Sequence, residues 1–138
     1  MKDLLHSQKI SQVLTPAVKT TTQTSAEVDM QGFESLNVLF SIGQSGDTLS
    51  GSLKWTLKLE HSDMTSTGFA DVEAAGVLNT AATVVIDAAA EDEAVYTLGY
   101  KGGKQFVRAV ATATGTHTNG TPMAILAVQG DASRNPAA

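Results

Sequence analysis

Residues 53–60 read Leu-Lys-Trp-Thr-Leu-Lys-Leu-Glu and alternate apolar and polar side chains without interruption. Successive side chains of a strand point to opposite faces, so this alternation predicts an antiparallel strand with one face buried. Trp55 keeps step with the leucines and is therefore expected in the core. The predicted buried face comprises Leu53, Trp55, Leu57 and Leu59, and the other face comprises Lys54, Thr56, Lys58 and Glu60.

Further strand signals follow along the chain, each rich in β-branched or aromatic residues and bounded by turn residues. The clearest is 33–42, where Leu36, Val38, Phe40 and Ile42 share one face. We expect it to pair with 53–60 as a hairpin with a long loop. One helical turn is expected within 69–78. The remaining predicted strands are 82–86, 95–100, where Tyr96 and Tyr100 share a core-facing side with Leu98, 106–112 and 123–128.

Two glycine-containing segments are expected to be hairpin turns. Residues 99–104 lie between two predicted strands, and they do not resemble a phosphate loop because no helix pattern follows them. Asn119-Gly120 fits a tight turn, and Thr121 after it would complete a glycosylation acceptor only in a secreted protein. About seven or eight short strands at this spacing predict an all-β fold, an antiparallel β-sandwich or a jelly-roll-like small barrel, with an immunoglobulin-like sandwich also open.

Length and composition limit the classes of function. A chain of 138 residues corresponds to one domain with its own core. There is no cysteine, which excludes disulfides and thiolate metal sites. The formal net charge is −5, with 9 basic and 14 acidic residues and no basic cluster, so we expect no nucleic-acid partner. No stretch has the length of a membrane span, and we expect no membrane partner.

The chain ends differ from its middle. Residues 1–24 are interpreted as an N-terminal arm, 25–130 as the β-sandwich domain and 131–138 as a C-terminal tail. A short helix is possible from Asp3, ending near Leu14 because Pro16 disfavours helix before it. An ordinary edge strand folded onto its own domain is the alternative to an arm that reaches a neighbour. The start lacks an apolar secretory region, so export by that route is not expected.

No arrangement of residues predicts catalysis, a cofactor or a metal. His6, His61 and His117 stand in separate segments, and we interpret them as surface or strand-end residues rather than metal ligands. Residues 91–93 are the one acidic cluster, but their spacing lacks the alternating ligands of a calcium loop, so a solvated turn is expected. The catalytic, cofactor-binding and metal-binding residues are therefore predicted to be none.

Several stretches resemble a known class of protein. They are Leu-Glu-His-Ser-Asp at 59–63 leading to Gly-Phe-Ala-Asp-Val at 68–72, residues 96–108, the opening Met-Lys-Asp-Leu, and Met-Gln-Gly-Phe-Glu-Ser at 30–35. Together they resemble small virion structural proteins of tailed phages and prophages, over residues 1 to 129. Among these, the chain is most similar to capsid decoration (cement) proteins.

The resemblance implies a non-enzymatic β-rich protein that stabilises the head shell by binding across major capsid subunits. It implies the major capsid protein and sister copies as partners, a homo-oligomer on the capsid, and a place on the virion surface after synthesis in the host cytoplasm. An arm of this kind would add a strand to a neighbour's sheet edge. The partner-binding residues expected from the arm are Leu4, Leu5, Ile10, Val13, Leu14, Thr20, Thr21 and Thr22.

Three alternatives remain at this point. A head-tail connector or tail protein would share the composition. A carbohydrate-binding β-sandwich module would be expected to display aromatic residues on a flat face, whereas aromatics here are 5% of the chain. An enzyme would require the fold to gather His61, Asp63 or the acidic residues at 91–93.

Overall fold

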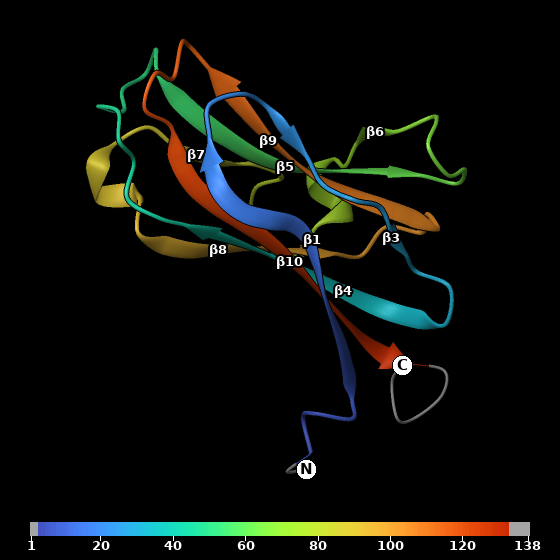
Figure 1. Cartoon of the computed structure of the whole chain (residues 1–138). Helices are drawn as coiled ribbons and strands as arrows, with labels where there is room; N and C mark the ends of the chain where they lie inside the picture. Colours follow the sequence, from blue (N-terminus) through green and yellow to red (C-terminus); the bar gives the residue numbers. More distant parts are fainter. Residues whose placement is uncertain (1–2, 133–138) are drawn as a thin grey trace.

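The protein is an antiparallel β-sandwich in the computed structural model, which describes residues 3–132 (Figure 1). Sheet A has the strand order β1-β10-β4-β8, and sheet B has the order β2-β9-β5-β6, with β3 on β9 and β7 on β5. The strands are β1 (Gln8–Lys19), β2 (Gln23–Thr24), β3 (Val28–Asp29), β4 (Phe33–Ile42), β5 (Lys54–Ser62), β6 (Ala70–Asp71), β7 (Val84–Ile86), β8 (Ala94–Tyr100), β9 (Phe106–Thr114) and β10 (Thr121–Ala132). Two 3₁₀ turns complete the fold, η1 (Ala74–Gly76) and η2 (Ala89–Glu91).

The all-β class predicted from the alternation is confirmed, whereas a jelly roll and an extended N-terminal arm are not. Every second residue is buried from Leu36 to Ile42 in β4 and from Trp55 to Leu59 in β5, as expected from their sequences. These two rows face each other across the core, where Phe40, Trp55 and Leu57 are fully buried. None of the residues from 3 to 132 forms a helix that is long and apolar enough to cross a membrane.

The three predicted hairpins are wrong. β4 pairs with β10 and β8, whereas β5 pairs with β9, so the connection at 43–53 crosses from one sheet to the other. The segments 101–105 and 115–120 also cross between sheets, because each joins a strand of sheet A to a strand of sheet B. Two strands that each bury one row of large side chains can place those rows face to face, which a hairpin within one sheet would not do.

Residues 8–19 form an edge strand, not a helix. β1 pairs with β10 along its length, with register shifts between Gln12 and Leu14 and between Leu14 and Ala17. Pro16 lies in the irregular part, and an edge strand tolerates proline because the missing N–H is not needed on the open side. The structure therefore shows the alternative in which residues 8–19 are an edge strand folded onto their own domain. The expected tail at 131–138 begins inside β10, and its residues from 133 onward lie outside the described part.

His117 is buried, which corrects its interpretation as a surface or strand-end residue. Its imidazole packs on the Trp55 indole with ring centroids 4.7 Å apart. Nε2 lies 3.3 Å from the carbonyl oxygen of Lys54 and 3.2 Å from that of Thr114. The segment 115–120 folds over this end of the core, and the ring fills the space beneath it.

Candidate interaction surface

The two sheets differ in the chemistry of the faces they turn away from the core. In sheet A, the strand register aligns the outward side chains in rows across the strands. We call this set the sheet A outer face. It consists of Gln8, Ile10, Gln12, Phe33, Ser35, Asn37, Leu39, Ser41, Val95, Thr97, Gly99, Ala124, Leu126, Val128 and Gly130.

The sheet A outer face carries no charged side chain. Ile10 is 58% exposed and Val95 is 60% exposed, while Leu39, Leu126 and Val128 are partly exposed between them. An exposed apolar area of this kind is uncommon on a protein that acts alone, and the centres of protein interfaces are depleted in charged residues. This face therefore has the depletion of charged residues that is found at the centres of protein interfaces.

The outer face of sheet B has the opposite character. Glu60 on β5 accepts bonds from Arg108 on β9, with Nη2 2.7 Å from Oε1, and lies 3.6 Å from the Lys58 ammonium. Lys58 also binds Asp71 on β6 at 2.7 Å, and this bond raises the pKa of the lysine. The Arg108 guanidinium lies 4.1 Å from the centre of the Phe69 ring. These charges satisfy one another, so this face is suited to water.

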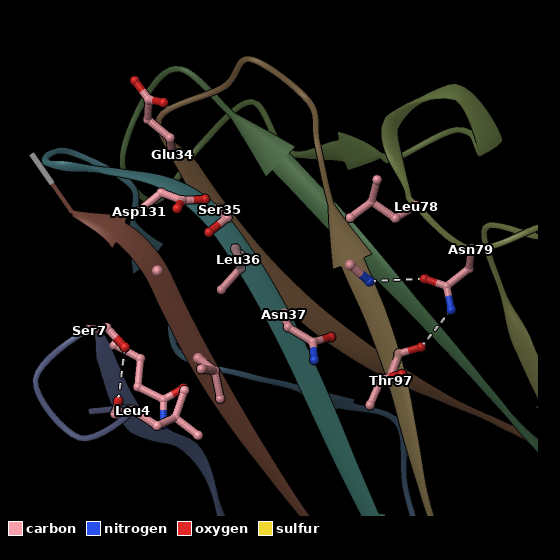
Figure 2. Close-up of a pocket in the computed structure, with 14 residues that line it drawn as sticks. Leu4, Ser7, Glu34, Ser35, Leu36, Asn37, Leu78, Asn79, Thr97 and Asp131 are labelled. Carbon is pink, nitrogen blue, oxygen red and sulfur yellow. Dashed lines mark hydrogen bonds between the residues drawn. The ribbon is translucent and has the colours of Figure 1, made fainter. Parts of the chain in front are cut away.

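A shallow depression of about 1060 Å³ lies at one end of the sheet A outer face. Figure 2 shows Asn37 and Thr97 on its floor, with Leu4 on one side and Leu78 on the other. Asn79 beside Leu78 binds the edge of β8, donating to the carbonyl of Thr97 at 2.9 Å and accepting from the N–H of Gly99 at 2.9 Å. The side-chain amide of Asn79 thus satisfies two backbone groups at the edge of β8.

The structure divides the expected partner-binding residues into three groups. Leu4, Leu5 and Ile10 are exposed apolar residues, of which Ile10 lies on the sheet A outer face and Leu4 lines the depression at its end. Val13 and Leu14 instead pack against the core. The remaining three, Thr20, Thr21 and Thr22, are exposed in the connection after β1, where the hydroxyl of Thr22 accepts a hydrogen bond from the N–H of Ala113 at 3.0 Å.

Four apolar residues of this surface were not singled out from the sequence. They lie on β4, β8 and β10 and are Leu39, Val95, Leu126 and Val128. A signal for two of them is present in residues 123–128, Met-Ala-Ile-Leu-Ala-Val, where apolar residues occupy both faces of the strand. A strand that is apolar on both faces is typical of one covered on both sides.

The fold does gather His61 and Asp63, which an enzyme would require, next to Tyr100 and Lys104. The Tyr100 hydroxyl lies 2.8 Å from His61 Nδ1 and accepts a bond from the backbone N–H of Lys104 at 3.0 Å. The Lys104 ammonium binds Asp63 at 2.8 Å. Burial lowers the pKa of His61 and raises that of Tyr100.

This cluster holds the connection between β8 and β9 in place. Tyr100 is only 3% exposed, and its hydroxyl bonds fix the turn at 101–105. Gly102 lies directly against it, since a Cβ there would be 2.5 Å from the hydroxyl oxygen. The cluster's polar groups are thus engaged with one another, which is a structural arrangement.

The acidic residues at 91–93 do not form a ligand set. Asp92 accepts a bond from the Ser45 N–H at 2.9 Å and thereby ties two connections together. Glu91 interacts with Asp87, which raises the pKa of Glu91. No group of three or more metal-binding side chains is present among residues 3–132.

The comparisons with known proteins leave the surface as the main guide to function. No protein-family model matches the chain, and no curated protein matches it in sequence.

Proposed function

We propose that the protein is a non-enzymatic structural component of a tailed-phage virion, a decoration protein that binds the outside of the head shell. The observation that carries the proposal is the sheet A outer face, which carries no charged side chain and exposes aliphatic residues among small polar ones. The resemblance of the sequence to small virion structural proteins supplies the partner, the major capsid protein.

The contrast between the two sheets supports a one-sided attachment. A decoration protein needs one face for the shell and another for water, and sheet B carries the ion pairs expected of the second. The exposed Leu4 lines the depression at the end of the first face and extends its apolar area. Many copies on a repeating shell bind firmly even when each contact is modest.

The alternative functions have less support. A head-tail connector or tail protein could use the same face, and copy number separates it from a decoration protein. A carbohydrate-binding module would be expected to present several aromatic rings on a flat face, whereas the strands of sheet A place only Phe33, at the start of β4, on this side.

The experiment compares two valine variants for binding to particles that lack the protein. Val95 lies on the edge strand β8 of sheet A, and Val85 lies on β7 at the edge of sheet B. They are 60% and 38% exposed, so Val95→Lys and Val85→Lys should both fold. We expect Val95→Lys to cosediment with particles at least about tenfold more weakly, because it buries a charge at the contact.

Val85→Lys should bind like the unmodified protein. Equal binding by both variants would exclude the sheet A outer face as the contact, and failure of the unmodified protein to bind would count against the virion proposal.

A further inference from the structure

The outer edge of β1 is open over a short, well-defined stretch. β10 pairs with one side of β1, and no strand within residues 3–132 pairs with the other (Figure 1). From Gln12 onward the edge is irregular, and the N–H of Ala26 donates to the carbonyl of Val13 at 2.9 Å. Regular backbone without a strand partner is therefore confined to residues 8–12.

Most edge strands carry features that prevent pairing with another chain, such as proline, bulges or several charges. In β1, Pro16 and the register shifts lie beyond Gln12, and within 8–12 the single charge is that of Lys9. Ile10, in the centre of the open stretch, is 58% exposed. The stretch is thus ready to accept a strand.

The open stretch is also self-complementary. Its side chains on the sheet A outer face read Gln8, Ile10, Gln12, which is the same sequence in both directions. In an antiparallel pair of two copies centred on residue 10, Ile10 lies opposite Ile10 and Gln8 lies opposite Gln12. A side-chain amide both donates and accepts, so the glutamines can pair with each other. On the inner side Lys9 lies opposite Ser11, and no like charges meet.

We infer that two copies of this chain associate through residues 8–12 of β1, antiparallel and centred on Ile10. The two-fold axis is perpendicular to the sheet, so sheet A of one copy continues into sheet A of the other with both outer faces on the same side. The chain has a net charge of −5, and this contact brings together no acidic residue.

A second copy is the occupant that this edge fits best, because the row Gln8, Ile10, Gln12 is complementary to itself in an antiparallel pair. The inference does not depend on the proposed function. A chain that pairs in solution but fails to bind particles would support the inference and overturn the proposed function. A chain that binds particles but does not pair in solution would support the proposed function and overturn the inference.

The first test is disulfide formation between purified full-length chains. The protein has no cysteine, so a single Ile10→Cys residue can link only to another copy. Val18→Cys is the matched control, since Val18 lies on the same strand beyond the irregular part and is also 58% exposed. Ile10→Cys should cross-link at least about tenfold faster, because pairing raises the local thiol concentration. Equal rates would overturn the inference.

The second test measures the strand register by the same cross-linking, in chains in which Ile10 is also replaced by a charged residue. One chain carries Gln12→Cys and the other carries Gln8→Cys. Each chain also carries either Ile10→Lys or Ile10→Glu. When both chains carry Ile10→Lys, or both carry Ile10→Glu, linkage should be slow because like charges meet at the axis.

A mixture of one Lys chain and one Glu chain should regain fast linkage. Circular dichroism verifies that each variant folds. If the mixture links no faster than either variant alone, residue 10 does not face residue 10 and the inference is wrong.

Discussion

The indole Nε1–H of Trp55 donates a hydrogen bond of 3.0 Å to Oγ1 of Thr121, joining β5 in sheet B to β10 in sheet A. Both side chains are fully buried. The threonine hydroxyl in turn donates to the hydroxyl of Ser45 at 2.9 Å. A polar link between the sheets therefore fixes their relative position at this end of an otherwise apolar core.

We expect Thr121→Val to destabilise the protein by about 1–3 kcal/mol, because the substitution leaves the indole N–H buried without an acceptor. Trp55→Phe removes the donor but also part of the packing. The double variant should cost less than the sum of the two single variants, since the hydrogen bond can be lost only once. Urea unfolding of the four proteins measures this coupling, and simple additivity would show that the bond contributes nothing.

The Asp47 carboxylate predicts a pH dependence of stability. It accepts hydrogen bonds from the backbone N–H groups of Asn119 at 3.0 Å and Gly120 at 2.8 Å, and these bonds lower its pKa. A lowered pKa contributes stability above the unfolded value near 3.8, and this contribution is lost as the pH falls through the folded value. Asp47→Asn should therefore be less stable than the unmodified protein at pH 7, as measured by thermal unfolding.

The difference between these two proteins should shrink as the pH falls below about 4. A difference that stayed constant down to the acid limit of the fold would show that the charge of Asp47 has no part in the effect.

The turn before β10 requires glycine at position 120. Gly120 has a φ of +81°, and a Cβ there would lie 2.6 Å from the carbonyl oxygen of Lys19. Gly120→Ala should cost more than about 1 kcal/mol, because the left-handed backbone and the close approach both oppose a side chain. Gly103→Ala is the matched control, since no atom lies within 4 Å of its added Cβ. If chemical denaturation showed equal stability for both variants, this explanation would be wrong.

The ion pairs on sheet B should differ in their contribution. Glu60 binds both Arg108 and Lys58 and its side chain is 15% exposed. Glu60→Gln should cost about 0.5–1 kcal/mol at low salt and less at high salt. Asp63→Asn should have no measurable effect, because its pair with Lys104 is exposed. Urea titrations at two salt concentrations test the contrast, which a salt-independent loss at Glu60 would contradict.

Alternation along single strands was enough to predict most of the buried side chains of β4, β5 and β8, because a strand with one covered face must alternate. Leu53 is the exception, since it lies before the start of β5 and is only partly buried. The partners of those strands were not predictable in the same way. The pattern around Phe40 and that around Trp55 are equally consistent with neighbouring strands and with strands in opposite sheets. That choice depends on contacts distant in sequence, such as β1 with β10.

The interaction surface was predictable only in part. Leu4, Leu5 and Ile10 were predictable because they belong to the apolar residues of the first segment of the chain. Val95 and Leu39 lie on strands that already have a full row of apolar residues for the core. Two further apolar residues on the other side of these strands do not by themselves indicate an exposed surface, which becomes evident only from the order of the four strands of sheet A. The misplacement of His117 has a similar origin, since a polar loop gives no sign that it folds over Trp55.

The number of copies of this protein per particle distinguishes a decoration protein from other virion components, and quantitative mass spectrometry of purified virions from its source against the major capsid protein measures it. A decoration protein should be present in a number comparable to that of the shell protein. A small fixed number of copies would indicate a connector or tail component, and absence from the particles would contradict the virion assignment.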